Sequence, residues 1–183
     1  MRIIAGEKRG TKLTSPIGEN TRPTTDRVRE SLFGSIQFEV TGAQILDLFA
    51  GSGALGLEAL SRGAKEAVFC DVDAGSIKVI EKNIETLGYA AKSKVIKNDF
   101  LNAIALFKNT RKFDIVFIDP PYKRGYYEAV FEALASGEVL AGDALLVAES
   151  AQGLEIEGKG FVFDKRKKYG KTFLDFFRWQ NGL

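Results

Sequence analysis

The 183-residue chain contains no histidine, and Cys70 is its single cysteine. The lack of histidine excludes serine–histidine–aspartate and cysteine–histidine catalytic groups and the usual zinc sites, so no metal is expected. One cysteine excludes an internal disulfide and indicates a reducing, cytoplasmic setting. Cys70 ends the apolar run 67–70, which predicts a buried structural role. Any catalysis therefore depends on carboxylates, backbone carbonyls, aromatic rings and a bound cofactor.

Long apolar segments are also missing. No run of 18 or more apolar residues occurs, so no membrane span is expected. The first residues, Met1–Gly6, are too short and too soon interrupted to predict a signal peptide. A chain of this length with 45% hydrophobic residues suits one hydrophobic core. We predict a single domain over 1–183, with an amino-terminal hairpin and helix over 1–40 and a catalytic core over 41–183.

Charge is distributed unevenly along the chain. Residues 1–40 carry seven basic and five acidic groups, residues 41–158 carry 12 and 17, and residues 159–183 carry seven and two, giving net charges of +2, −5 and +5. Basic ends around an acidic middle favour contact of both ends with a polyanion, although charge runs are often only a solvated face. We expect the densest basic cluster, 165–171, to lie on a terminal hairpin, apart from the strand ends.

From residue 44 onward, apolar runs and glycines predict alternating strands and helices. The expected strands are 44–48, 67–70, 94–97, 113–118 and 144–148. The expected helices between them are 54–62, 74–87, 100–107 and 126–134. Five strands separated by helices predict a parallel, doubly wound α/β sheet.

Segments at both ends extend this pattern. Residues 2–13 predict a small hairpin. A helix that starts at Thr24 or Thr25 and runs to about Phe38 is expected to bury Val28, Leu32 and Ile36. The final runs, 161–168 and 172–179, predict an antiparallel hairpin.

The segment Asp119-Pro120-Pro121-Tyr122 directly follows the apolar strand 113–118. Its prolines stiffen the loop, because proline fixes φ and removes a backbone donor. A carboxylate and the carbonyl before a proline can accept both hydrogens of an exocyclic amine, while an aromatic ring stacks on the base. The segment resembles the signature of methyltransferases that use S-adenosylmethionine to methylate exocyclic base amines. All four residues are candidate catalytic residues, and a plain surface turn is the alternative.

A second motif, 47–56, turns from a short strand into a helix through glycines. Gly51 and Gly53 allow close approach of a ligand, and the helix amino terminus offers N–H donors. With Gly56, these glycines also fit a dinucleotide fingerprint, in which Asp71 lies about 20 residues further on. Asp47 favours the methyl donor, because a carboxylate there repels a pyrophosphate and suits the amino group and sulfonium of an amino-acid-type cofactor. The alternative for Asp47 is a helix N-cap.

Acidic residues follow four consecutive expected strands, namely Asp47, Asp71, Asp99 and Asp119. Ligands of doubly wound sheets bind at this edge. We expect Asp71 to hold ribose hydroxyls, with Asp73 as a rival. Asp99 and Phe100 are expected to meet the adenine, although Phe100 equally fits core packing. The candidate cofactor-binding residues are Asp47, Phe49, Gly51, Ser52, Gly53, Asp71, Val72, Asp99 and Phe100.

Several motifs together carry a family resemblance: 2–6, Arg9-Gly10, Leu13, 22–30, 47–53, 119–122 and Tyr169-Gly170. They resemble the RsmD family of bacterial 16S rRNA guanine-N2 methyltransferases. The resemblance implies a class I methyltransferase (Rossmann-like) fold, with a seven-stranded, mostly parallel sheet that ends in an antiparallel hairpin. It also implies methyl transfer from S-adenosylmethionine to N2 of a guanine in 16S rRNA, within an assembling small subunit. Thr11 stands where a further arginine is common, which removes one phosphate contact.

Direct in-line transfer is expected, with no covalent enzyme intermediate, and an unpaired RNA loop is the expected target. The candidate RNA-binding residues are Arg9, Lys12, Arg22, Thr24, Thr25, Arg27, Arg29, Lys123, Arg124, Lys165, Arg166, Lys167 and Lys168.

Three alternatives explain less of the sequence. A DNA adenine-N6 methyltransferase usually carries a separate recognition domain, for which 183 residues leave little room. An NAD-dependent oxidoreductase leaves the Asp119 loop unexplained. A non-catalytic RNA-binding module does not explain acids at four strand ends.

Overall fold

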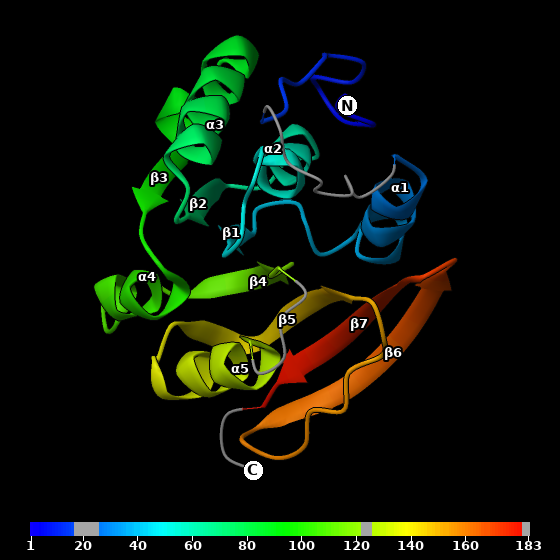
Figure 1. The fold of residues 1–183 in the computed structure, drawn as a ribbon, viewed down its shortest axis with the longest axis vertical. Coiled ribbons are helices and arrows are strands. Elements are labelled where there is room, and N and C mark those ends of the chain that lie inside the picture. The colour runs from blue at the N-terminus through cyan, green and yellow to red at the C-terminus, as the bar shows by residue number, and fades with distance from the viewer. Residues whose placement is uncertain (17–25, 122–125, 181–183) are drawn as a thin grey trace.

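The computed structural model describes residues 1–16, 26–121 and 126–180. Its centre is a seven-stranded sheet with the strand order β3-β2-β1-β4-β5-β7-β6 (Figure 1). The strands are β1 (Gln44–Asp47), β2 (Glu66–Asp71), β3 (Ser93–Lys97), β4 (Phe113–Ile118), β5 (Leu140–Ser150), β6 (Phe161–Tyr169) and β7 (Thr172–Trp179). The helices are α1 (Asp26–Ser35), α2 (Ala54–Ser61), α3 (Ala74–Leu87), the short 3-10 helix η1 (Ala90–Lys92), α4 (Phe100–Phe107) and α5 (Tyr126–Ser136).

Strands β1 to β5 are parallel, and β7 pairs antiparallel with both β5 and β6. This arrangement confirms the expected class I methyltransferase fold with a terminal hairpin. Helices α3 and α4 and strand β4 have the expected bounds. Strand β5 is longer than expected, because a shift in register after Phe113 lets Leu140 also pair along β4. Helix α1 stops at Ser35, before the expected end at Phe38, which lies in a following turn and is 91% exposed.

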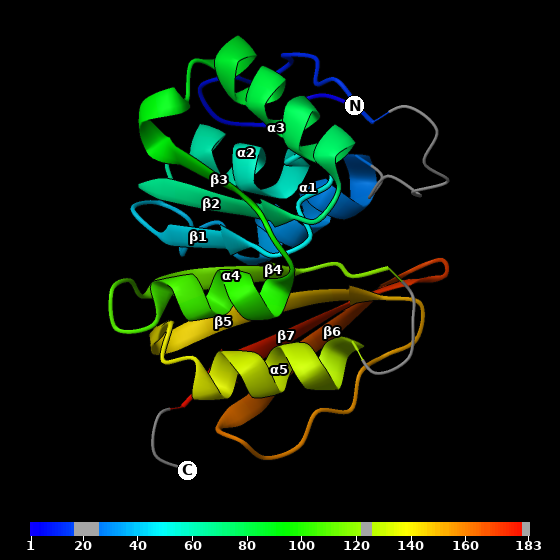
Figure 2. The ribbon, with the colours of Figure 1, turned by 60° about the vertical axis from the view of Figure 1, so that its left-hand side comes forward.

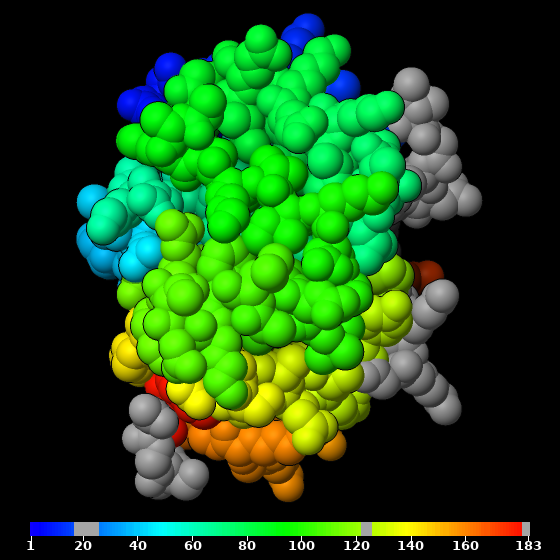
Figure 3. Space-filling model, turned by 90° about the vertical axis from the view of Figure 1, so that its left-hand side faces the viewer, coloured from blue at the N-terminus to red at the C-terminus, as the bar shows by residue number. Residues whose placement is uncertain are grey.

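Helices cover both faces of the sheet. Figures 1 and 2 show α1, α2 and α3 on one face and α4 and α5 on the other. Strand side chains alternate between the faces, so Phe69 and Phe117 pack in the core beneath α1, α2 and α3, whereas Val116 and Leu146 pack beneath α4 and α5. In Figure 3, the amino-terminal residues, in blue, lie at the opposite end of the molecule from the start of β6, in orange. Within the described residues, no helix is both long and apolar enough to cross a membrane.

The amino-terminal segment forms the expected hairpin. The Ile3 N–H donates to the Thr11 carbonyl over 3.0 Å, and the Gly10 N–H donates to the Ile3 carbonyl over 2.9 Å. Glu58 of α2, which is fully buried, accepts from the N–H groups of Ile4 at 2.8 Å and Ala5 at 3.0 Å. A buried carboxylate with backbone donors holds this hairpin on α2.

The third glycine of the turn motif has a packing role. A Cβ atom at Gly56 would lie 2.3 Å from Cε1 of Phe69. Because only glycine leaves room for that ring, α2 can lie close against β2. The third glycine of a dinucleotide fingerprint has this same packing role, so Gly56 does not distinguish a methyl donor from a dinucleotide.

Candidate active site

Strand register brings acidic side chains together at the carboxyl edge of the sheet. Asp47 lies opposite Phe69 and Phe117, so Asp71 and Asp119 each lie two residues further along, on the same face. All three point to the side covered by α1, α2 and α3, as the alternation of strand side chains requires. No cluster of three metal-ligating side chains occurs in the described part of the chain.

Two of these carboxylates hold the glycine turn. Asp47 Oδ2 accepts from the Gly56 N–H at 3.1 Å, and Asp71 Oδ2 accepts from the Gly51 N–H at 2.8 Å. Gly51 and Gly53 have positive φ angles of 54° and 79°, a region that favours glycine. Gly53 occupies the N-cap position of α2. Asp47 thus binds the first turn of α2 from strand β1 and is not its N-cap.

Asp47 is a strongly perturbed acid. It is 3% exposed, and burial raises its pKa to about 7; the Gly56 N–H opposes this rise and the Asp71 charge adds to it. A nearby cationic group would favour the ionised carboxylate. The site is therefore suited to a ligand that carries positive charge beside Asp47.

Asp47→Asn is expected to stabilise the unliganded protein above neutral pH. Between the ordinary aspartate pKa and about 7, the native state binds more protons than the unfolded state, so wild-type stability falls as pH rises through that range. Asparagine does not titrate and still offers an oxygen to the Gly56 N–H. We expect its free energy of unfolding to exceed that of the wild type by roughly 2 to 4 kcal/mol at pH 8, and by much less at pH 4.

Urea denaturation at pH 4, 6 and 8 measures this difference, and Asp143→Asn, at an exposed position, is the matched control. A stability difference that does not change with pH would contradict the assigned pKa shift.

The two rival ribose-binding acids have different environments. Asp71 Oδ1 accepts from the Asp73 N–H at 2.9 Å in addition to the Gly51 bond. Asp73 caps α3, because its Oδ2 accepts from the Ser76 N–H at 2.7 Å. Asp71 is therefore the acid fixed beside the glycine turn, and Val72 between them is exposed.

The acid after β3 is a helix cap. Asp99 accepts from the Asn102 N–H at 2.9 Å, and the Asn102 Nδ2 donates to its second oxygen at 2.7 Å. The Asn102 N–H, as the largest cause, lowers the pKa of Asp99. Each oxygen keeps a lone pair for a further donor.

Three half-buried rings form a triangle at this edge. The ring centroid of Phe100 lies 5.8 Å from that of Phe49 and 6.1 Å from that of Tyr126, and Phe49 and Tyr126 are 6.1 Å apart. Phe100 therefore packs against neighbouring rings while it lies beside Asp99. Tyr126 was not among the sequence candidates, because its place at the start of the expected helix 126–134 does not show that its ring meets Phe49 and Phe100.

Asn83 of α3 is a further residue that sequence reasoning missed. It is buried; its Oδ1 accepts from the Thr14 N–H at 2.8 Å, and its Nδ2 donates to the carbonyls of Thr14 at 3.0 Å and Ser52 at 2.9 Å. Asn83 thus joins the amino-terminal segment to the glycine turn. An amide within the apolar stripe of α3 was the available signal.

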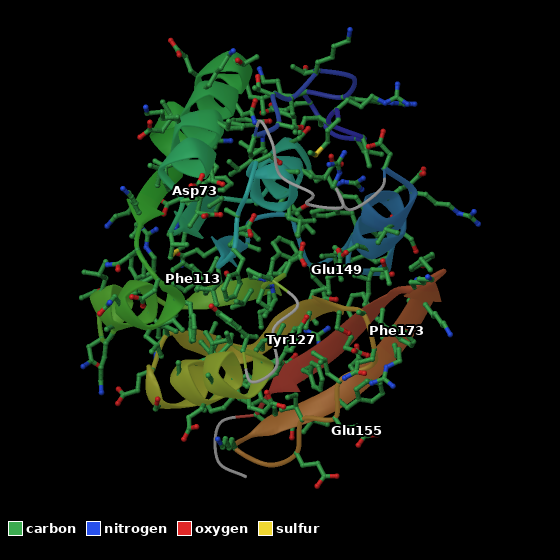
Figure 4. The ribbon with its side chains drawn as sticks, in the orientation of Figure 1. Asp73, Phe113, Tyr127, Glu149, Glu155 and Phe173 are labelled. Carbon is green, nitrogen blue, oxygen red and sulfur yellow. The ribbon has the colours of Figure 1, made fainter. Side chains whose placement is uncertain are left out.

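The Asp119 loop lies beside a second buried acid, Glu149 at the end of β5. Asp119 is half-buried, Pro120 is buried and Pro121 is exposed, whereas Tyr122 lies outside the described residues. Burial raises the pKa of Asp119 well above its ordinary value, and the charges of Glu149 and Asp47 raise it further. The Tyr127 hydroxyl donates to the Glu149 carbonyl at 2.7 Å, and Figure 4 labels both residues in this region.

The described candidate RNA-binding residues lie in two regions, the amino-terminal part of the chain and the terminal hairpin. Exposed positions near the amino terminus and on α1 include Arg9, Lys12 and Arg27. Arg29 does not fit its expected role, because its guanidinium is fully buried and donates to the Arg2 carbonyl and to Asp26. The candidates Arg22, Thr24, Thr25, Lys123 and Arg124 lie outside the described residues.

The terminal hairpin, formed by β6 and β7, places the tip of the basic cluster 165–171 at the carboxyl edge of the sheet. Phe173 of β7 lies opposite Ser150 at the carboxyl end of β5, so the hairpin tip reaches the same edge as Asp119. The expectation that the cluster lies apart from this edge is therefore wrong. Lys165 and Lys167 are partly exposed and Lys168 is exposed.

Arg166 has a structural partner within this cluster. Its guanidinium donates to the buried carboxylate of Asp175, and its NH2 group donates to the Leu154 carbonyl at 2.8 Å. These contacts tie the 151–160 connection to the hairpin. Arg166 is therefore a weaker candidate for RNA contact than its lysine neighbours.

Comparisons with known proteins agree with this architecture. A family model described as "Conserved hypothetical protein 95" matches residues 1–178. Ribosomal RNA small subunit methyltransferase D of Escherichia coli strain K12 is 43% identical over 150 residues, which cover 82% of this chain and 74% of that protein. The protein of the same name from Haemophilus influenzae strain Rd is 38% identical over 151 residues, covering 82% of this chain and 78% of that protein.

A solved structure extends the match to the fold. The Escherichia coli protein yhhF, named as a methyltransferase, superposes with a TM-score of 0.88 at 38% identity and covers 98% of both chains. The chain therefore belongs to the ribosomal RNA small subunit methyltransferase D (RsmD) family.

Proposed function

We propose that this protein transfers a methyl group from S-adenosylmethionine to N2 of a guanine in 16S rRNA. The observation that carries the proposal is the row of carboxylates from Asp71 through Asp47 to Asp119, which joins a glycine turn to a proline-stiffened amine-binding loop. The names of the family members support rRNA as the substrate. The proposed setting is the cytoplasm, with the assembling small subunit as the substrate particle.

The residues around the glycine turn fit S-adenosylmethionine. A Cβ at Gly51 would meet nothing within 4 Å, so this backbone has open space beside it. Asp47 would face the amino group and the sulfonium, and Asp71 the ribose hydroxyls, whereas both carboxylates would repel a pyrophosphate. When bound, S-adenosylmethionine supplies an electrophilic methyl group. The remaining proposed contacts are Phe49, Ser52, Gly53, Val72, Asp99 and Phe100.

The amine-binding loop would act by orientation. The Asp119 carboxylate and the Pro120 carbonyl would each accept one hydrogen of the guanine amine, which polarises the amine and aims its lone pair outward. The ring of Tyr122 is proposed to stack on the base, and Pro121 stiffens the loop. Methyl transfer leaves the amine with an excess proton, and the raised pKa of Asp119 suits that carboxylate to receive it.

Helix α1 would lie between the two RNA-binding ends. Arg2 pairs with Asp26 of α1 at 3.5 Å, and the Ser31 hydroxyl contacts the Tyr169 hydroxyl near the hairpin tip. Basic side chains of both ends could therefore bind phosphates on one RNA surface that approaches the carboxyl edge.

Mass mapping tests the proposed function. Small-subunit particles and free 16S rRNA from cells that lack this gene are incubated with the protein and labelled S-adenosylmethionine. We expect one N2-methylguanine, formed only when protein and methyl donor are both present. Label in adenine N6 of added DNA, without label in rRNA, would instead support the DNA methyltransferase alternative.

A further inference from the structure

Guanine presents two neighbouring donors on its Watson–Crick edge, the N2 amine and the N1–H. Adenine presents an acceptor at N1, and so does 2-aminopurine, which keeps the N2 amine. We propose that Glu149 is a specificity-determining residue that accepts the N1–H of the target guanine, while Asp119 and the Pro120 carbonyl hold N2. This inference rests on the proposed function.

The sheet register places Glu149 beside the amine-binding loop. Ile118 of β4 lies opposite Ala148 of β5 in a parallel pair, so Asp119 and Glu149 are the next residues on adjacent strands. Val147 belongs to the core beneath α1, α2 and α3, and Glu149 follows it by two residues on that same face. Asp119 also points to this face. The two carboxylates are thus neighbours on one side of the sheet, as N1 and N2 are neighbours on one base edge.

The backbone of Glu149 is held rigidly. Strand β5 pairs with β4 on one side and with β7 on the other, where Glu149 lies opposite Leu174. The Tyr127 hydroxyl donates to the Glu149 carbonyl at 2.7 Å. Groups that discriminate between ligands work best on such fixed elements, because a rigid group cannot move to accommodate the wrong base.

The chemistry of the pair favours a base edge with two donors. Glu149 is only 5% exposed, and its charge is among the causes that raise the pKa of Asp119. Two adjacent N–H donors would relieve this repulsion. A base with an acceptor at N1 would instead place a lone pair against a buried carboxylate, and a site built to bind an N–H strongly rejects an analogue that lacks it.

A base substitution combined with Glu149→Gln tests the inference. After the target guanine has been mapped, particles are reconstituted with rRNA that carries guanine or 2-aminopurine at that position. The wild type is expected to prefer guanine by at least about tenfold in kcat/KM. A glutamine amide can donate to N1, so the variant is expected to shift the guanine-to-2-aminopurine ratio by about tenfold or more toward 2-aminopurine. Glu155→Gln, at an exposed position, should keep the wild-type ratio.

Calorimetry with S-adenosylmethionine checks that the Glu149→Gln variant is folded. An unchanged base ratio in a folded variant, or equal loss on both bases with weakened cofactor binding, would overturn the assignment and leave Glu149 with a structural role. Glu149→Asp serves as a second variant; it should lower the rate on guanine without favouring 2-aminopurine. A wild type that methylates no guanine at all would instead refute the proposed function, so the two failures are distinguishable.

Discussion

Asp119→Ala is expected to lower methyl transfer to rRNA by at least about tenfold, which corresponds to about 1.4 kcal/mol of transition-state stabilisation. The alanine removes one of the two acceptors that orient the guanine amine. Cofactor affinity should change little, because Asp119 lies beyond the glycine turn that Asp47 and Asp71 hold. Stability should not fall, since the variant loses a half-buried carboxyl group that the charge of neighbouring Glu149 disfavours in its ionised form. Single-turnover kinetics and calorimetry measure the two quantities separately.

Asp119→Asn is the matched control, because asparagine keeps an acceptor oxygen and should retain more activity than alanine. The wild-type rate is expected to rise with pH as Asp119 ionises through its raised pKa, and the asparagine variant should lack this dependence. Full activity in Asp119→Ala would remove the amine-binding role of this loop.

Simultaneous replacement of Lys165, Lys167 and Lys168 by alanine should weaken rRNA binding and flatten its salt dependence. Each lost phosphate contact is expected to reduce the slope of log affinity against log salt by roughly 0.7 to 0.9, so three contacts reduce it by about 2. Arg166 stays unchanged, because its removal would leave the buried carboxylate of Asp175 without its ion pair and would confuse stability with binding.

Replacement of Lys78, Lys82 and Lys92 is the charge-matched control, since these exposed lysines lie on or near α3, at the other end of the sheet. Cofactor binding should be normal in both triple variants, because three strands separate β6 from β1 and its glycine turn. Equal salt slopes in the hairpin variant and the wild type would mean that the hairpin lysines are only solvated. Docking would then depend on the amino-terminal cations.

Local sequence signals predicted most helices and strands. They did not predict which residues become neighbours through strand pairing across the sheet. Acids after apolar runs correctly indicated the carboxyl edge. Glu149 follows the expected strand end at Ala148 in the same way, yet its place beside Asp119 depends on the parallel pairing of β4 with β5. The position of the hairpin tip likewise depends on the strand order, which local periodicity does not contain.

Long-range polar contacts explain the other differences. Arg29 belongs to a basic segment, but its buried guanidinium bonds a carbonyl 27 residues earlier. Glu58 and Asn83 bind backbone groups of the first 14 residues from 53 to 69 positions away. No local pattern distinguishes such a residue from a solvated one, because its partner is chosen by the tertiary fold.

The Asn83 amide has a thermodynamic consequence for how the two substrates are bound. It bonds the Thr14 carbonyl and the Ser52 carbonyl through one side chain, so the segment proposed to meet RNA and the turn proposed to meet the methyl donor share a partner. A shift of either one that strained these hydrogen bonds would change the free energy of the other through this amide. Such a coupling free energy is reciprocal: the factor by which RNA alters affinity for the methyl donor equals the factor by which the methyl donor alters affinity for RNA.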